Sequence, residues 1–403
     1  MSPKQGKIVT SREMPTRTGY EMMRSPMRAL PKQNIADLAR WGFERDDVIP
    51  LWFGESDLVT PSFISDAAGR ALAAGHTFYT HQRGIPELRA ALSAYMSGLY
   101  RKPVAVERIT ATSGGMAGIL MSMEILLQPG DNVVVVEPVW PNIQGAIHIM
   151  GGVKRSVGME PGNDGWRLDL RKVEAACDRH TRAVFLASPG NPTGWMITAE
   201  QQRALLDLAR SRGFWIVSDE VYTRLVYDRP VAPSFLDIAG DEDPVIVINS
   251  FSKSWAMTGW RVGWLTHPVS IGDTLAQVVQ YNTSGTATFI QHAAVAAITE
   301  GEGFVAEMRV RCQAGRDIAC DALERMRRVR LPARPAGGMY VFFEVEGMTD
   351  SLAMCGRIFE RTGVGLAPGS AFAEGCDNYL RACIALSPEK LRDAMKRIAP
   401  LLS

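Results

Sequence analysis

The feature that most constrains this chain is a repeated alternation, between residues 109 and 248, of short runs rich in valine and isoleucine with longer helical patterns. Such alternation predicts βα units and a mainly parallel sheet. The run NVVVV at 132–136 is so apolar that both of its faces must be covered. We therefore expect an α/β fold in which helices sandwich the sheet. The other expected strands are 109–112, 183–187, 214–217 and 245–248.

Helix signals fall between these strands. The pattern at 116–127 follows Ser-Gly-Gly and is ended by Gln-Pro-Gly-Asp. A second helix should begin at Thr198, where Gln201 completes a capping box, and end at Gly213.

The length of 403 residues is too great for one ordinary domain, for which roughly 100–200 residues are usual. After about residue 290 the pattern becomes helical, then strand-like at 338–345, and then helical to the end. We predict a large cofactor-binding domain and a smaller α/β domain built from both ends of the chain. The expected segments are 1–52 (N-terminal part of the small domain), 53–290 (large domain) and 291–403 (small C-terminal domain with a linking helix).

Composition excludes several classes of function. The 44 basic and 43 acidic residues leave a net charge of +1, which gives no field for nucleic acid or an acidic membrane. No apolar run approaches the roughly 18 residues of a membrane span, and the first residues lack a signal-peptide core. Six scattered cysteines form neither a CxxC pair nor a metal motif, so we expect free thiols, no metal and a cytoplasmic protein.

Each predicted strand runs into a polar turn: SGG, EPVW, SPGNPTG, SDEVY and NSFSK. Ligands of open α/β sheets bind beyond the carboxyl ends of the strands, so these distant turns should converge on one site.

Lys253 is the strongest candidate for chemistry. It follows a strand between small hydroxyl residues and should be poorly solvated, which lowers an amine pKa and makes the amine nucleophilic. Ser250, Ser252 and Arg261 would form an anion site beside it. The alternative, a solvated surface lysine, fits poorly with the neighbouring tryptophans and glycines.

Other turn residues suit a bound aromatic cofactor. Asp219 could protonate and orient a ring nitrogen, with Tyr222 in reach, although a helix N-cap is the plainer interpretation of Asp219 alone. Asn191 is fixed by prolines and glycines as a hydrogen-bond donor, or marks an ordinary turn. The glycines before the helix at 116–127 offer free N–H groups to a phosphate.

Two more residues carry alternatives. Trp140 could stack on an aromatic ring or simply be buried in the core. Arg381, charged amid apolar neighbours, could clamp a carboxylate or form a structural ion pair.

Taken in order, nine segments resemble the class I/II aminotransferases, pyridoxal-phosphate enzymes of fold type I with the aspartate-aminotransferase fold. The resemblance covers most of the chain, from about Leu51 to Arg381. The segments are LWFGESDLVTP, YTHQRGIPELR, TSGGMAGI, EPVW, SPGNPTG, SDEVY, SFSK with GWRVG, GGMYVFF and YLRACIAL.

The resemblance implies a role for each matching residue. Lys253 resembles the lysine that holds pyridoxal 5'-phosphate as a Schiff base and moves the substrate proton, with Asp219 and Tyr222 completing the catalytic set. Tyr79 resembles the tyrosine that reaches the neighbouring subunit's cofactor, which implies a homodimer. The cofactor-binding set would be Gly114, Gly115, Met116, Trp140, Asn191, Asp219, Tyr222, Ser250, Ser252, Lys253 and Arg261 with that Tyr79; the substrate-binding set would be Gly54, Asn191, Arg381, Phe53 and Tyr340.

The implied reaction is ping-pong transamination between an L-amino acid and a 2-oxo acid. Met116 stands where some dicarboxylate-specific relatives place a lysine, and Trp52, Phe53 and Tyr340 give an apolar, aromatic wall. We therefore expect a substrate with a neutral or aromatic side chain. The alternatives are a pyridoxal-phosphate lyase, decarboxylase or cyclising enzyme on the same fold, and a non-catalytic ligand-sensing module.

Overall fold

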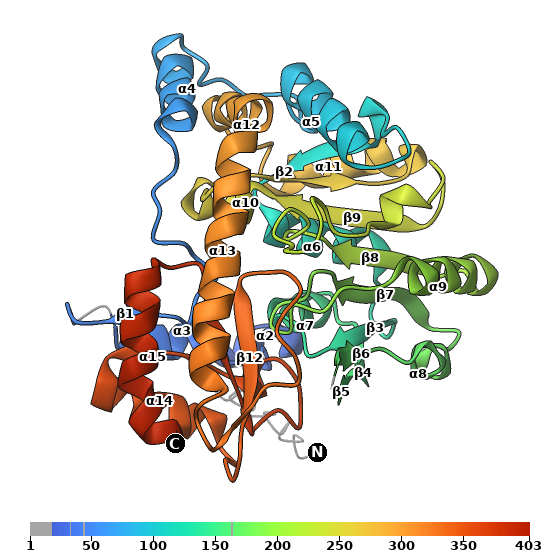
Figure 1. Ribbon diagram of the computed structural model, residues 1–403. Coiled ribbons are helices and arrows are strands. Elements are labelled where there is room, and N and C mark those ends of the chain that lie inside the picture. Colours follow the sequence, from blue (N-terminus) through green and yellow to red (C-terminus); the bar gives the residue numbers. More distant parts are fainter. Residues whose placement is uncertain (1–17, 33, 43–44, 163) are drawn as a thin grey trace, which may run out of the picture.

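The computed structural model describes residues 18–32, 34–42, 45–162 and 164–403. Its centre is a seven-stranded sheet in the order β2-β10-β9-β8-β7-β3-β4 (Figure 1). Every neighbouring pair is parallel except those made by β10, which runs antiparallel to β2 and β9. The strands are β2 (Ile109–Thr112), β3 (Asn132–Glu137), β4 (Val153–Gly158), β7 (Thr181–Ala187), β8 (Trp215–Asp219), β9 (Val245–Ser250) and β10 (Gly263–Thr266).

Helices cover both faces of this sheet, as the sequence predicts. Successive side chains of one strand point to opposite faces of the sheet, so Val133 and Val134 belong to different cores. One core is closed by α6 (Gly115–Leu126), α7 (Asn142–Ile149) and α11 (Gly272–Asn282). The other is closed by α4 (Ser62–Ala73), α5 (Pro86–Leu99), α8 (Leu170–Ala176), α9 (Ala199–Arg212) and α12 (Thr288–Glu300).

The predicted elements between residues 109 and 250 are present. All five predicted strands form, and α6 follows the glycine pair. Thr198 and Gln201 make the reciprocal capping box at the start of α9, and Gly213 ends that helix in the left-handed conformation. These local signals decide the structure here because capping and turn chemistry agree with the apolar pattern.

A second, antiparallel sheet has the order β11-β12-β15-β14 and lies below the first in Figure 1. Its strands are β11 (Val329–Arg330), β12 (Tyr340–Val345), β14 (Ala367–Pro368) and β15 (Tyr379–Cys383). The helices packed with it are α13 (Glu302–Leu323), α14 (Ser351–Thr362) and α15 (Pro388–Leu402).

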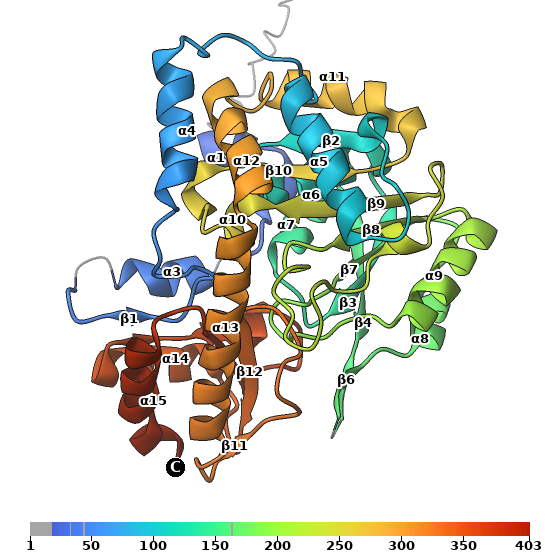
Figure 2. The same ribbon diagram turned by 45° about the horizontal axis from the view of Figure 1, so that its top comes forward.

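The N-terminal segment packs with this second sheet. In both views α3 (Asn34–Arg40) and β1 (Ile49–Pro50) lie beside α14 and α15 (Figure 1; Figure 2). β1 pairs in parallel with β13 (Val364–Gly365), and Leu38 and Leu51 belong to the same core as Val341. The N-terminal helices α1 (Gly19–Met22) and α2 (Ser25–Arg28) precede this segment.

The pattern change near residue 290 does not coincide with a change of core. Helix α12 buries Ala293, Ala294 and Ala297 in a core of the seven-stranded sheet. The chain crosses toward the second sheet only along α13, the long helix that spans both layers in Figures 1 and 2. The division of the chain at residues 52 and 290 thus stays a prediction, and packing favours a later crossing point. No helix among the described residues is long and apolar enough to cross a membrane.

Candidate active site

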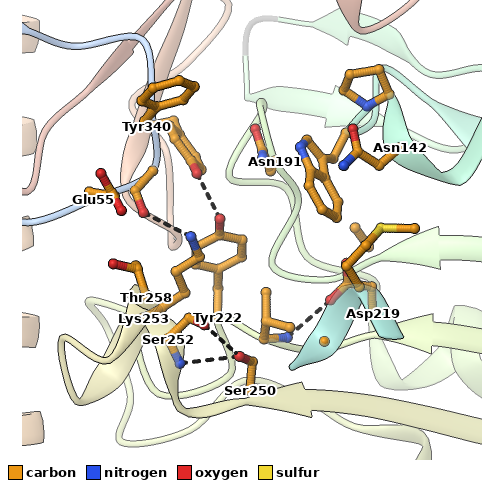
Figure 3. A pocket seen from close by; sticks show the side chains of 18 of the residues that line it. Glu55, Asn142, Asn191, Asp219, Tyr222, Ser250, Ser252, Lys253, Thr258 and Tyr340 are labelled. Atoms are coloured by element: carbon orange, nitrogen blue, oxygen red, sulfur yellow. Dashed lines mark hydrogen bonds between the residues drawn. The ribbon is translucent and has the colours of Figure 1, made fainter. Parts of the chain in front are cut away.

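The carboxyl ends of β3, β7, β8 and β9 border a cavity of about 480 Å³, and Figure 3 shows it from close by. Three parts of the chain line it: the N-terminal segment, the turns after the large sheet's strands, and the second sheet. All but two of the predicted site residues line this cavity; the two exceptions are Gly114 and Tyr79. The polar turns thus converge as the sheet topology predicts.

Lys253 lies on the short helix α10 (Phe251–Ser254), directly after β9. Ser250 caps this helix by accepting a hydrogen bond from the Ser252 N–H, and this fixes the lysine at the cavity edge. The Lys253 amine donates to the carbonyl oxygen of Gly54 at 2.8 Å. Burial lowers the pKa of Lys253 to about 8, so a substantial fraction of the amine is neutral near physiological pH. A neutral amine is the nucleophilic form.

Asp219 is the last residue of β8 and is buried. Its carboxylate accepts a 3.3 Å hydrogen bond from the Val221 N–H in the following turn, and no helix begins there, so it is not a helix N-cap. Burial raises the pKa of Asp219 to about 6. A buried carboxylate with this little compensation suits a cationic ring nitrogen as its partner.

Arg381 lies on β15, 2% exposed, and its contacts match a prepared clamp. One guanidinium nitrogen donates to Asn191 Oδ1 at 3.0 Å and another to the backbone carbonyl of Trp52. The guanidinium carbon lies 4.3 Å from the centre of the Tyr340 ring, and its Nε is buried without a partner. No salt bridge involves Arg381 within the described chain, so the structural-ion-pair alternative is not supported. An unpaired donor on a buried cation calls for an anionic ligand such as a carboxylate.

The predicted phosphate cradle assembles at the start of α6. Gly114 has φ +97°, and a Cβ there would lie 2.4 Å from Nη2 of Arg261. Glycine is thus required both for the backbone conformation and for the approach of the arginine. The hydroxyls of Ser250 and Ser252 lie 2.9 Å apart beside the free N–H groups of the helix end. Hydroxyls, a guanidinium and a helix N-terminus are the donor set that a phosphate ester needs.

Tyr222 lies in the turn after β8 and is buried. Its hydroxyl makes a 2.7 Å hydrogen bond with the hydroxyl of Tyr340, and Figure 3 shows the two phenols pointing toward each other. The rings meet edge to face, with 5.7 Å between centroids.

The rest of the wall is mainly apolar and includes residues that sequence reasoning missed. Asn142 stands two residues after Trp140 and is the first residue of α7, so the reasoning that identified Trp140 could have been extended to it. Ile35 and Ala36 carry no motif, and only packing brings α3 to the cavity. Phe53, Met116 and Trp140 lie in the wall as predicted; the unpredicted lining residues include Ile35, Ala36, Glu55, Ile119, Asn142 and Thr258.

Tyr79 is not brought to this cavity. Its side chain is 94% exposed and lies beside a separate hollow formed by residues 77–80 and 283–289. The adjacent Phe78 is 83% exposed. Among the described residues, no group of three His, Cys, Asp or Glu side chains gathers in a way that could hold a metal ion.

Comparison with known proteins gives one consistent result. The family model described as aminotransferase class I and II matches residues 46–398. The chain is 34% identical to the aspartate aminotransferase of Thermotoga maritima over 359 residues, which is 89% of this chain and 92% of that protein. It is 33% identical to a probable N-acetyl-LL-diaminopimelate aminotransferase of Bacillus subtilis over 88% of this chain and 89% of that protein. The crystal structure of the Thermotoga maritima enzyme superposes with a TM-score of 0.87 at 32% identity, covering 94% of this chain and all of that one.

Proposed function

The chain belongs to the class I and II aminotransferases, a family that depends on pyridoxal phosphate, and from this premise we propose its reaction. It transfers an amino group between an L-amino acid with a neutral or aromatic side chain and a 2-oxo acid, in two half-reactions of a ping-pong mechanism. The names of similar proteins span different substrates, from aspartate to N-acetyl-LL-diaminopimelate, so the substrate class must come from the cavity.

The residues of the cavity fit pyridoxal phosphate. Gly114, Gly115, Ser250, Ser252 and Arg261 would hold its phosphate. Asp219 would hold its ring nitrogen in the protonated state, since the buried carboxylate has no cation partner in the described chain. Trp140 would lie against the ring, and Asn191 and Tyr222 would bond its phenolic oxygen. When bound, the cofactor supplies an electron sink for the charge left on the substrate Cα.

The side chains then divide the work of proton transfer. Lys253 takes the proton from the substrate Cα and would return a proton at C4′ of the cofactor. Burial lowers the pKa of Lys253 to about 8, so the amine can accept and release a proton near neutral pH. Arg381 binds the α-carboxylate through its unpaired Nε, assisted by the backbone at Gly54. Fixing the carboxylate fixes the direction of the Cα–H bond, which converts binding into orientation.

One observation supports transamination most: the weakly basic Lys253 amine and the Arg381 clamp line the same cavity as Asn191 and Asp219. Together they offer a proton carrier, a carboxylate site and a partner for a ring nitrogen at one place.

The neutral side-chain preference rests on the charges of the wall. The cations among the described lining residues are Lys253, Arg261 and Arg381, and each has a proposed task. The remaining wall, including Phe53, Met116 and Trp140, presents apolar and aromatic surface. A second substrate carboxylate would lose its hydration there without gaining a partner in this chain.

The reaction is tested by recording the visible absorption of the purified protein with pyridoxal phosphate while L-amino acids are added one at a time. Transamination predicts that the visible absorption band of the bound cofactor disappears when the amino acid is added and returns when a 2-oxo acid is added. A band that merely shifts, or substrate consumption without loss of the band, would contradict the proposal and favour a lyase or cyclising reaction. The side-chain preference is tested by kcat/KM, which should be higher for phenylalanine or leucine than for aspartate.

We further propose that the enzyme works as a homodimer in which Tyr79 completes the neighbouring site. Its exposure of 94%, next to Phe78 at 83%, is unusual for a large aromatic side chain and suits a surface that a second subunit covers. Mixing inactive Lys253→Ala subunits with weakened Tyr79→Ala subunits should restore activity, since each mixed dimer then holds one intact site. No restoration in confirmed mixed dimers would place Tyr79 outside the site. A cytoplasmic location is supported by six cysteines that are all free.

A further inference from the structure

Tyr340 connects the two halves of the site. It is the first residue of β12 in the second sheet, it is 2% exposed, and its hydroxyl reaches Tyr222 in a turn of the large sheet. Its ring lies beneath the guanidinium of Arg381. One side chain therefore contacts both the proposed partner of the cofactor's phenolic oxygen and the proposed clamp for the substrate carboxylate.

The ring and the hydroxyl make different contacts. The ring faces Arg381, whose two terminal nitrogens are already bonded to Asn191 and to the Trp52 carbonyl. Edge contacts alone leave a guanidinium free to tilt about the line that joins them, and an aromatic face removes that freedom. Tyr340 provides the nearer face, and Phe372, whose ring centre lies 4.9 Å from the guanidinium carbon, provides a second one.

The hydroxyl lies where several site groups meet. A Cβ on Gly54 would come within 1.8 Å of the Tyr340 hydroxyl, so this position is open only because residue 54 is glycine. The same Gly54 accepts the hydrogen bond from Lys253. The 2.7 Å distance between the two hydroxyls fits either one as the donor. Tyr222 has one proton, so when it donates to a ligand its oxygen is left to accept from the Tyr340 O–H.

We propose that Tyr340 is a positioning residue with two separable actions: its ring fixes the plane of the Arg381 guanidinium, and its hydroxyl directs the proton of Tyr222 into the cavity. This inference rests on the proposed roles of Arg381 and Tyr222. It goes beyond a place in the pocket wall because it assigns different consequences to the two parts of one side chain.

Four variants separate the two actions: Tyr340→Phe keeps the ring and removes the hydroxyl, Tyr340→Leu removes both, and Tyr222→Phe is made alone and combined with Tyr340→Phe. Tyr379→Phe is the matched control. Tyr379 lies in the same sheet, 7% exposed, and its ring stacks on Phe342 at 4.8 Å, but it does not line the cavity.

The hydroxyl is tested by titrating the absorption of the bound cofactor with pH. A weaker donor at the cofactor's phenolic oxygen stabilises the deprotonated form of the bound cofactor less. The apparent pKa of the bound cofactor, read from its absorption, should therefore rise. Tyr340→Phe should raise it by about half a pH unit, less than Tyr222→Phe does, since one neutral hydrogen bond of modest strength is lost. The double variant should match Tyr222→Phe alone, because the Tyr340 hydroxyl acts only through Tyr222.

The ring is tested with 3-phenylpropanoate, a carboxylate without an amino group, whose dissociation constant (Ki) is obtained by titrating it into the cofactor-loaded protein and following the absorption of the bound cofactor. Tyr340→Phe should change its Ki by less than about twofold, whereas Tyr340→Leu should raise it about tenfold, as expected for loss of a buried cation–π contact. Tyr379→Phe should change neither the Ki nor the titration. Tryptophan fluorescence gives the dissociation constant of pyridoxal phosphate, which should rise less for Tyr340→Phe than for Tyr222→Phe.

Three results would overturn the proposal: no spectral shift in Tyr340→Phe, full additivity in the double variant, or equal effects of Phe and Leu on the Ki. The Phe variant preserves the packing and so decides the hydroxyl's role even if Tyr340→Leu does not fold. Both readouts need only cofactor binding and carboxylate binding. They stay valid if the wild-type enzyme proves not to transaminate, so a failure of that reaction is distinguishable from a failure of this inference.

Discussion

The side-chain amine of Lys253 donates a hydrogen bond to the backbone carbonyl of Gly54, a residue 199 positions earlier in the chain. This bond joins the short helix α10, directly after β9 of the large sheet, to the segment that follows β1, the strand paired with β13. The Lys253 amine is therefore held by a neutral backbone carbonyl. When this hydrogen bond breaks, no charged partner is left behind. The carbonyl steadies a neutral amine as an acceptor and adds no negative charge that would raise the lysine pKa.

The environment of Lys253 predicts how cofactor attachment depends on pH. Only the neutral amine reacts with the aldehyde of pyridoxal phosphate, and burial lowers the pKa of this amine to about 8. The attachment rate of cofactor-free protein should therefore rise about tenfold between pH 7 and pH 9 and then level off. A rate that keeps rising toward pH 10.5 would show an ordinary, solvated lysine.

Stopped-flow absorbance measures this rate directly. Lys253→Ala should show no attachment at any pH and should lose turnover by a factor of about 10³ or more, since the proton carrier is removed. Lys172, an exposed lysine paired with Glu160, provides the control, and Lys172→Ala should leave the pH profile unchanged.

Gly114→Ala should weaken cofactor binding by about tenfold or more. The new Cβ would lie 2.4 Å from Nη2 of Arg261, and φ +97° is a backbone conformation that alanine rarely adopts. The arginine must then move away from the phosphate site. Equilibrium dialysis against pyridoxal phosphate measures the change.

The matched control is Gly98→Ala, near the end of α5, where an added Cβ meets no atom within 4 Å. That substitution should leave cofactor affinity unchanged and stabilise the helix slightly. If both variants bind the cofactor equally well, the cradle assigned to Gly114 and Arg261 is wrong.

We expect Glu220 to make the stability of the cofactor-free protein depend on pH. It follows Asp219, it is 1% exposed, and one of its carboxyl oxygens has no hydrogen-bond partner. Burial raises the pKa of Glu220 to about 8 from an ordinary value of 4.5. A raised carboxyl pKa means that the fold favours the neutral acid, so its contribution is fully present below pH 4.5 and is lost as pH rises through 8.

Glu220→Gln keeps a neutral side chain of the same shape and should remove this dependence. We expect the variant to gain about 2–5 kcal/mol relative to the wild type between pH 5 and pH 9. Urea unfolding of both cofactor-free proteins at pH 5, 7 and 9 gives the difference, which includes the electrostatic coupling of Glu220 to the neighbouring Asp219. Parallel stability curves would show that Glu220 is already ionised at pH 5.

The sequence was sufficient for the strands β3, β7, β8 and β9 and for the cations of the site. It was wrong for β15, which carries Arg381 in a stretch where we expected helix, and it missed Glu55 in the cavity wall. Strands such as β3 and β9 are continuous apolar runs, and the residues that follow them converge because parallel strands end at one edge. Lys253 and Arg381 could be identified singly because a polar group amid apolar neighbours demands a chemical reason. Asp219 alone was more plainly explained as a helix N-cap, and its role came only with the resemblance of the ordered segments.

Elements and contacts that depend on packing escaped prediction. Strand β4 (VKRSVG) is a mostly polar edge strand, and β10 (GWLT) is a short segment inside a motif that we interpreted only as an anion site. The Tyr222–Tyr340 hydrogen bond joins residues 118 positions apart, one in the turn after β8 and one on β12 of the second sheet. Local patterns carry no information about such a pair, because its geometry is set by how the two sheets dock.

Substrate choice can be shifted at one position of the cavity wall. Met116 follows the cradle glycines on α6 and lines the cavity. Met116→Lys places a cation where the wall is otherwise apolar, so the ratio of kcat/KM for aspartate to that for phenylalanine should rise about tenfold or more, as one partly desolvated charge pair provides.

Met116→Leu, which keeps an apolar side chain of similar volume, should leave the ratio within about twofold. Steady-state assays with the two amino acids and a common 2-oxo acid acceptor measure both ratios. If the lysine lowers kcat/KM for both amino acids equally, residue 116 does not face the substrate side chain, and the proposed preference must come from another part of the wall.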